Sequence, residues 1–386
     1  MSVTAARGFR AAGVTAGLKP SGAPDVAVVV NDGPSRAAAG VFTANRVAAA
    51  PVLWSRQVLT DGRADAVVLN SGGANAATGH AGFQDTHRTA EHTAAALGVS
   101  AGDVVVCSTG LIGERLPLDT LLAGVDAGVR ALSADGGQDA AVAIKTTDTV
   151  TKTAVSAGDG WTVGGMAKGA GMLAPGMATM LCVITTDADL PAQALQEALA
   201  EAVRTTFNRV DSDGCMSTND TVVLMASGAS GAAPEPAVFA ERLHAVCADL
   251  SRQLVADAEG AAHDVLIRVV NASSEEAGEA VARAVSRSNL FKAAIFGQDP
   301  NWGRVISAVG TVPEDVAPFD ADALDVSFNG VQVCRSAGVG DPRDGVDLSG
   351  REVTVEIDLH AGDAVVELWT NDLTHDYVHE NSAYST

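Results

Sequence analysis

The stretch from Lys168 to Asp187 (KGAGMLAPGMATMLCVITTD) constrains the fold most, because it joins a glycine-rich segment directly to an uninterrupted apolar run. The run 180–184 has the length and composition of a buried strand. The glycines before it can adopt backbone angles that are closed to other residues, so the peptide before Thr179 can be held bent at the start of the strand. We therefore expect the Ala178 carbonyl to be exposed to the Thr179 hydroxyl.

Thr179 is a candidate nucleophile. A threonine hydroxyl is weak unless a base lies beside it, and its own α-amine becomes such a base once the preceding peptide is cut. That amine titrates near neutrality. A threonine that opens a strand is more often structural, because its β-branched side chain suits the pleat. The hydroxyl alone leaves both roles open.

The segment 169–174 (GAGMLA) also matches the spacing of a dinucleotide-binding fingerprint. That motif needs a helix directly after it. Pro175 and Gly176 interrupt the chain where the helix would run, and the next residues have the composition of a strand. A nucleotide site is therefore disfavoured here.

Composition narrows the classes of partner. The chain has 47 acidic against 25 basic side chains, a net charge of -22, which repels nucleic acid and anionic membranes. The first residues lack the apolar core of a signal peptide, and no apolar run reaches the roughly 18 residues of a membrane span. We expect a cytoplasmic protein that binds neither nucleic acid nor membrane.

Metal and disulfide signals are weak. The five cysteines are scattered, odd in number and without a CxxC pair, which indicates reduced thiols. His375 and His379 lie four apart in HDYVH, but the segment lacks the glutamate of HExxH and a clear helical pattern. We expect no bound metal.

Short strands dominate the first third of the chain. A strand over 103–107 ends in Ser108, Thr109 and Gly110, and such an end can direct a hydroxyl and backbone N–H groups at a developing oxyanion. The same residues also suit a polar turn. The other elements expected before Lys168 are strands over 26–30, 40–43 and 66–69, a helix over 84–97 and a short helix over 139–143.

The second half alternates helices and strands, so we predict an α+β fold of sheets layered with helices. Asn329-Gly330 between two apolar runs predicts a hairpin, and alternation over 353–359 adds a strand, so we expect an antiparallel C-terminal sheet. The other expected elements are helices over 195–207 after Pro191, over 239–254, and over 275–287 capped by Ser273 and Glu276, with strands over 222–225 and 293–296 and a loop at DPNWGR.

The chain resembles the ornithine acetyltransferase family. KGAGMLAPGMATML is similar to the site at which members of that family cut themselves before the threonine of an Ala-Thr pair. Seven further blocks follow in family order. They are AAGVFTANRVAAAPV (38–52), NSGGANAATG (70–79), STGLIG (108–113), KTTDT (145–149), DSDGCMSTNDT (211–221), DPNWGR (299–304) and WTNDLTHDYVHENSAYST (369–386).

The resemblance implies a layered α/β sandwich that is cut between Ala178 and Thr179. Residues 1–178 then form an alpha chain, and residues 179–386 form a beta chain whose N-terminus is the nucleophile. Neither piece can bury its share of the sheets alone, so we expect them to stay associated. The family implies a heterotetramer of two alpha and two beta chains.

The resemblance also implies site residues. It gives Thr109 and Gly110 as the oxyanion hole, and it places substrate contacts at Thr146 or Thr147, between which the sequence does not choose, and at Lys168, Thr179, Glu259, Asn381 and Thr386. By residue type alone, a lysine beside glycine is usually solvated, a glutamate after a helix likewise, and a C-terminal tail usually frays.

The implied reaction moves an acetyl group from N2-acetyl-L-ornithine to L-glutamate through an acetyl ester on Thr179, without a metal or organic cofactor. It leaves acetyl-CoA open as a second donor. Two alternatives are a self-cleaving amidase or aminopeptidase that hydrolyses its acyl-enzyme, and an uncut binding protein. The match at Lys168, Glu259 and Asn381 favours the transferase.

Overall fold

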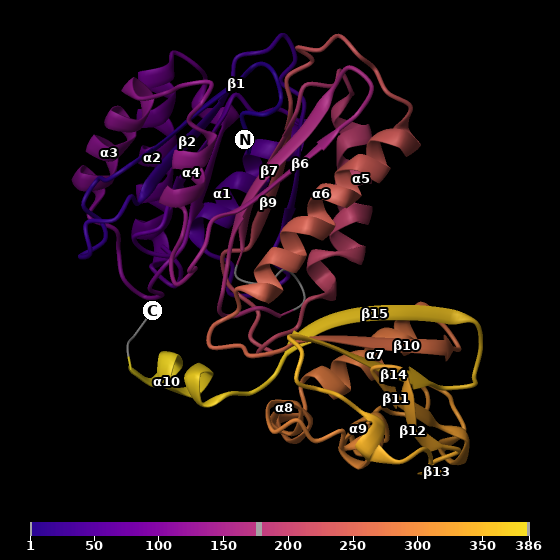
Figure 1. Cartoon of the computed structure of the whole chain (residues 1–386). Helices are drawn as coiled ribbons and strands as arrows, with labels where there is room; N and C mark the ends of the chain where they lie inside the picture. Colours follow the sequence, from indigo (N-terminus) through magenta and orange to yellow (C-terminus); the bar gives the residue numbers. More distant parts are fainter. Residues whose placement is uncertain (1, 175–179, 384–386) are drawn as a thin grey trace.

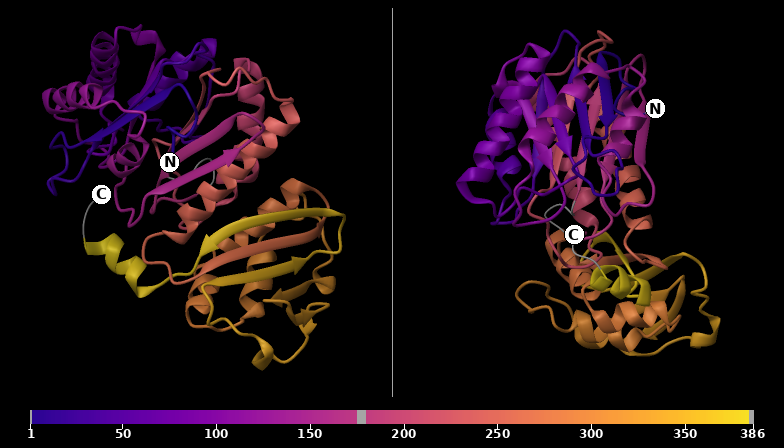
Figure 2. Two further views of the ribbon diagram at one scale, coloured as in Figure 1. Left: turned by 45° about the horizontal axis from the view of Figure 1, so that its top comes forward. Right: turned by 90° about the vertical axis from the view of Figure 1, so that its left-hand side faces the viewer.

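Three β-sheets organise the chain in the computed structural model, which describes residues 2–174 and 180–383 (Figure 1). Two of the sheets stack with helices outside them, and the third belongs to a C-terminal unit, residues 264–383, that lies beneath that stack in Figure 1. Figure 2 shows the same division from two further sides. This α+β architecture of layered sheets and helices confirms the predicted fold class.

The first sheet has the order β1-β2-β4-β5. β4 and β5 are parallel, whereas β1 and β2, and β2 and β4, are antiparallel. Helices α2 and α3 pack on its outer face, and α4 packs against β1 and β2. The bounds are β1 Phe9–Val14, β2 Val26–Asn31, β4 Ala66–Asn70, β5 Val104–Ser108, α2 Gly79–Leu97, α3 Leu118–Arg130 and α4 Gly137–Ala143.

The second sheet has the order β3-β9-β8-β7-β6, so the strand that follows the glycine-rich segment is its centre. That strand, β8, is buried along its whole length, which confirms the strand predicted from the apolar run. Helices α5 and α6 cover the outer face. The bounds are β3 Ala38–Phe42, β6 Lys152–Ala157, β7 Thr162–Lys168, β8 Leu181–Thr186, β9 Thr221–Ala226, α5 Ala192–Thr205 and α6 Pro236–Ala256.

The inner faces of these two sheets share one core. Val29 and Leu69 from the first sheet lie in the same apolar cluster as Met166, Val183 and Val223 from the second. Alternate residues of each strand point outward to the helices, as the period of two requires. The result is a four-layer sandwich in which the ends of strands from both sheets meet at one edge.

The third sheet has the order β13-β12-β11-β14-β10-β15 and its own core. The Arg252 guanidinium of α6 lies 3.3 Å from the ring centroid of Trp369 on β15 and joins this unit to the sandwich. The bounds are β10 Asp264–Ala272, β11 Asp325–Phe328, β12 Val331–Arg335, β13 Gly338–Val339, β14 Glu352–Asp358, β15 Ala364–Asn371, α7 Glu275–Ser286, α8 Asn289–Phe296, α9 Trp302–Val309 and α10 His375–Ala383.

One prediction about the sheets was wrong. The C-terminal sheet is mixed, because β10 inserts between β14, to which it is parallel, and β15, to which it is antiparallel. The strand predicted at 40–43 is confirmed as β3, which pairs with β9 in the second sheet and is followed by helix α1 (Ala50–Val58). That helix was missed at Pro51, which the first turn of a helix tolerates. The predicted hairpin at Asn329-Gly330 is confirmed between β11 and β12.

Four local predictions also need correction. The run 293–296 is the end of helix α8, because Ser288 caps it by accepting the Phe291 N–H. The cap of α7 is Ser274, which accepts the Ala277 N–H, and not Ser273. DPNWGR is only partly a loop, since α9 begins inside it, and HDYVH is helical in α10. Short 3₁₀ helices complete the chain at Leu59–Asp61, Ala101–Asp103, Phe207–Arg209, Ala321–Ala323 and Arg343–Gly345.

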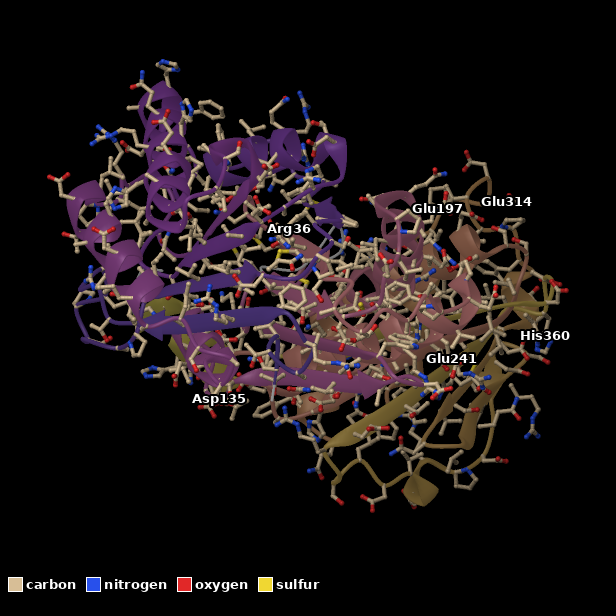
Figure 3. All side chains as sticks on the ribbon, turned by 90° about the horizontal axis from the view of Figure 1, so that it is seen from above. Arg36, Asp135, Glu197, Glu241, Glu314 and His360 are labelled. Carbon is tan, nitrogen blue, oxygen red and sulfur yellow. The ribbon has the colours of Figure 1, made fainter. Side chains whose placement is uncertain are left out.

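The surface carries the acidic excess of the sequence. Asp135, Glu197, Glu241 and Glu314 are exposed, and Figure 3 labels each of them. Within residues 2–174 and 180–383, no helix combines the length and the apolar character that crossing a bilayer requires.

Candidate functional site

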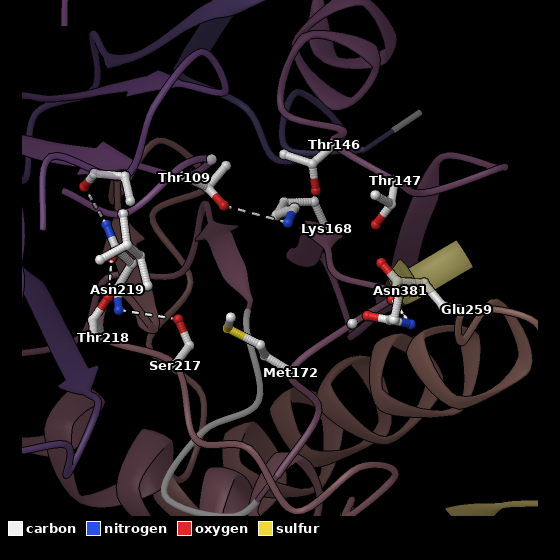
Figure 4. Close-up of a pocket in the computed structure, with 14 residues that line it drawn as sticks. Thr109, Thr146, Thr147, Lys168, Met172, Ser217, Thr218, Asn219, Glu259 and Asn381 are labelled. Carbon is white, nitrogen blue, oxygen red and sulfur yellow. Dashed lines mark hydrogen bonds between the residues drawn. The ribbon is translucent and has the colours of Figure 1, made fainter. Parts of the chain in front are cut away.

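A cavity of about 90 Å³ opens where the strand ends of the sandwich meet the C-terminal helix α10 (Figure 4). Thr109 and Gly110 follow β5, Lys168 ends β7, Glu259 follows α6, and Asn381 lies on α10. All the predicted site residues that the structure describes line it. They are Thr109, Gly110, Thr146, Thr147, Lys168, Glu259 and Asn381.

Two predicted site residues, Thr179 and Thr386, lie outside the described residues, as does Ala178. Met180 is the first described residue after that gap, and its N–H donates to Asp220 Oδ1 at 3.0 Å. Asp220 is fully buried, and its burial raises its pKa well above the usual range. Sequence reasoning did not single out Asp220, although it lies in the DSDGCMSTNDT block.

Thr109 and Gly110 form a rigid corner. The Thr109 N–H donates to the Asn70 carbonyl at 3.0 Å, so its backbone continues the pairing of β5 with β4. Gly110 has φ +133°, and a Cβ there would lie 2.8 Å from the Gly73 Cα. Only glycine fits this close approach. The corner therefore presents a hydroxyl and backbone to the cavity in one fixed geometry.

Lys168 is buried, with 1% of its surface exposed, and is not the solvated lysine that its glycine neighbour suggested. Its Nζ donates to Thr109 Oγ1 at 3.4 Å (Figure 4). Burial lowers the pKa of Lys168, and the nearby carboxylates of Asp148, Asp220 and Glu259 oppose that shift. The Lys168 amine thus lies beside the Thr109-Gly110 corner.

Glu259 and Asn381 form the opposite wall. Asn381 Nδ2 donates to Glu259 Oε2 at 3.0 Å, and the Glu259 N–H donates to the Ala170 carbonyl at 3.0 Å. α10 is held in place because Thr374 donates its hydroxyl to the Gly260 carbonyl at 2.6 Å. The tail is thus helical to Ala383 rather than frayed.

Thr146 and Thr147 both reach the cavity from the loop before β6, so the structure keeps both as candidates (Figure 4). The Thr146 N–H donates to Asp148 Oδ2 at 3.0 Å. The remaining wall comes from the loop before β9, through Ser217, Thr218 and Asn219. Asn219 donates to the carbonyls of Ala74 and Ser108 and so ties this loop to the first sheet; sequence reasoning missed this residue.

Chemically, the cavity combines a buried ammonium, a carboxylate, an amide and several hydroxyls within a small volume. That set suits the charged groups of an amino acid. Among the described residues, no group of three or more His, Cys, Asp or Glu side chains is arranged to hold a metal ion.

Comparisons with known proteins match this chain along nearly its whole length. The ArgJ family matches residues 10–386. Proteins named "Arginine biosynthesis bifunctional protein ArgJ" from Streptomyces coelicolor and Thermobifida fusca are 64% and 62% identical over 386 residues, covering all of each chain. A crystal structure of ornithine acetyltransferase complexed with ornithine, from Mycobacterium tuberculosis, is 61% identical with a TM-score of 0.45, covering 47% of this chain and 96% of that one.

Proposed function

The chain belongs to the ArgJ family, and from this membership we propose that it transfers acetyl from N2-acetyl-L-ornithine to L-glutamate through an ester on Thr179. It is an acyltransferase of arginine biosynthesis. The observation that carries the finer proposal is the convergence of Thr109, Lys168, Glu259 and Asn381 on one cavity from four separate elements.

The proposed reaction is a double displacement. The Thr179 hydroxyl attacks the acetyl carbonyl while its free α-amine takes the proton, and the tetrahedral oxyanion is stabilised at Thr109 and Gly110. Ornithine leaves with that proton on its α-amine. The α-amine of glutamate then attacks the acetyl ester, which restores the Thr179 hydroxyl and releases N-acetylglutamate. Exclusion of water from the ester keeps this route a transfer rather than a hydrolysis.

The polar walls fit these substrates. Both donors and acceptors are α-amino acids, so each brings a carboxylate that the buried Lys168 ammonium can pair with. Glu259, held by Asn381, supplies the opposite charge for the ornithine side-chain ammonium. Thr146 and Thr147 offer hydroxyls between these two walls.

We further infer that the chain is cut before Thr179 into residues 1–178 and 179–386. β7, from the first piece, pairs with β8, from the second, over six residue pairs from Val163↔Thr186 to Lys168↔Leu181. β3 and β9 join the pieces again across the same sheet. The pieces should therefore stay associated. From the family resemblance we further propose a heterotetramer of two alpha and two beta chains, and a cytoplasmic location.

The test is product analysis. Purified protein incubated with N-acetylornithine and glutamate should yield ornithine and N-acetylglutamate in equal amounts. Acetate in place of N-acetylglutamate would point to an amidase, and no turnover by an uncut chain would point to a binding protein. Parallel incubation of glutamate with acetyl-CoA measures whether the thioester also donates.

Gly171→Ala tests the Glu259 wall. A Cβ at Gly171 would lie 2.6 Å from Glu259 Oε2, so the carboxylate must move away from its bond with Asn381. A shift of about 1 Å should raise the KM for N-acetylornithine about tenfold or more. The control is Gly303→Ala on α9, where the nearest atom would be 3.5 Å away and kinetics should not change.

A further inference from the structure

A buried charge cluster lies directly behind the cavity, formed by Asp148, Lys152 and Asp257. The Lys152 side chain is fully buried, and its Nζ lies 2.6 Å from Asp148 Oδ1 and 2.5 Å from Asp257 Oδ2. An ion pair with no access to water is costly to build, and removing one partner leaves an uncompensated charge. Its place beside an active site therefore calls for a functional reason.

The Asp148 carboxylate holds two site segments at once. Its Oδ1 accepts the N–H of Gly169, the residue after Lys168, at 2.6 Å. Its Oδ2 accepts the N–H of Thr146, which lines the cavity, at 3.0 Å. One buried side chain thus bonds the backbone of two site segments, at Gly169 and at Thr146.

Asp257 anchors the same loop from the other side. It accepts the Thr149 N–H at 3.0 Å and bonds the Thr149 hydroxyl, and it lies two residues before Glu259. The cluster therefore joins the loop of Thr146 to the segment that carries the opposite wall of the cavity.

The electrostatic interactions of Asp148 and Lys168 agree with these hydrogen bonds. Burial favours the protonated form of Asp148, but Lys168, Lys152 and the Gly169 N–H hold its pKa well below the usual range. Asp148 in turn is the largest contribution opposing the loss of charge that burial imposes on Lys168. The ionisable groups that face Lys168 are Asp148, Lys152, Asp220, Glu259 and Lys19.

We propose that Asp148, braced by Lys152 and Asp257, is the positioning residue that directs the Lys168 side chain at Thr109 by fixing the adjoining Gly169 and the loop of Thr146. This inference rests on the proposed acetyl transfer. It assigns to the cluster a role that does not depend on contact with substrate. It moves no proton itself. It fixes where the Lys168 amine lies and opposes the loss of charge that burial imposes on it.

Asp148→Asn is the test, read as the pH profile of acetyl-enzyme formation from N-acetylornithine. Activity that needs protonated Lys168 is lost as pH rises through the lysine pKa. Removing the facing carboxylate lowers that pKa, so the basic limb should move down by about one pH unit or more. Asp148→Glu should return the limb toward its original position.

The matched control is Asp187→Asn. Asp187 is likewise buried, pairs with one cation, Arg7, and accepts two backbone N–H groups, yet it lies at the opposite end of β8. Its variant should lose a similar amount of stability with no shift in the basic limb. Lys168→Met should lose this basic limb together with most of the activity, and adding Asp148→Asn to it should lower the residual activity no further, since the responding group is gone.

Two outcomes distinguish the proposed function from the proposed role of Asp148. A wild-type protein that forms no acetyl-Thr179 overturns the proposed function itself. Acetylation by wild type, with an unshifted limb in Asp148→Asn, overturns only the role of Asp148. If Asp148→Asn fails to fold, the double variant Asp148→Asn/Lys152→Met removes both members of the ion pair. The basic limb of its pH profile should still move down, by a smaller amount, because Asp148 affects the pKa of Lys168 more than Lys152 does. An unmoved limb in the double variant would reject the proposal equally.

Discussion

Thr179→Ala should be recovered as one uncut chain with no acetyl transfer, while the wild-type protein should separate under denaturing conditions into residues 1–178 and 179–386. The proposed cut and the proposed transfer use the same hydroxyl, so its removal abolishes both steps. Intact-mass measurement reads the cut, and N-terminal sequencing should find threonine at the start of the second fragment. The loss of turnover should reach the detection limit of the assay.

Two variants control for this result. Thr179→Ser keeps a hydroxyl and should still be cut and acetylated, though more slowly. Thr186→Ala removes a buried threonine from the other end of β8, so it tests whether damage to the strand alone blocks processing. Cleavage at the same peptide together with transfer in Thr179→Ala would show that the nucleophile lies elsewhere.

Local sequence patterns predicted most elements of the sandwich, because its strands are apolar and its helices α5 and α6 have clear helical periods. These patterns failed at elements whose secondary structure or strand order depends on tertiary packing. The run 293–296 is too short for its period to separate strand from helix, and the Ser288 cap settles it as helix α8. Nothing local shows that β10 enters between β14 and β15, since strand order is set by contacts between distant segments.

The candidate site also contains some residues that could be predicted from the sequence and others that could not. Lys168, Glu259 and Asn381 were found through family resemblance, since a lone lysine, glutamate or tail asparagine carries no local signal, whereas Asn219 was missed. The burial of Lys168 could not be predicted, because the adjoining glycine suggests an exposed segment. The ion pair of Lys152 with Asp257 joins residues 105 positions apart, so only the folded chain reveals it.

Thr109→Ala should lower acetyl transfer by about a hundredfold or more, because it removes a hydroxyl placed to stabilise the oxyanion. The fold should barely respond. The Thr109 backbone N–H keeps its bond to the Asn70 carbonyl in the alanine variant, and the lost side-chain contact is a long one, 3.4 Å to Lys168 Nζ. We expect a change in the free energy of unfolding of about 1 kcal/mol.

Self-cleavage should slow in Thr109→Ala as well, since attack on the Ala178 carbonyl also develops an oxyanion. Thr109→Ser retains the hydroxyl and should recover both rates, which separates the chemistry from packing of the methyl group. Time courses of fragment formation and of N-acetylglutamate formation, measured on the same preparations alongside thermal unfolding, give all three quantities. If both rates stayed at their wild-type values, Thr109 would be only a turn residue. The oxyanion would then have to be stabilised by backbone N–H groups such as that of Gly110 and by the Lys168 ammonium. In the alanine variant this ammonium lacks its one described side-chain hydrogen-bond partner in the cavity.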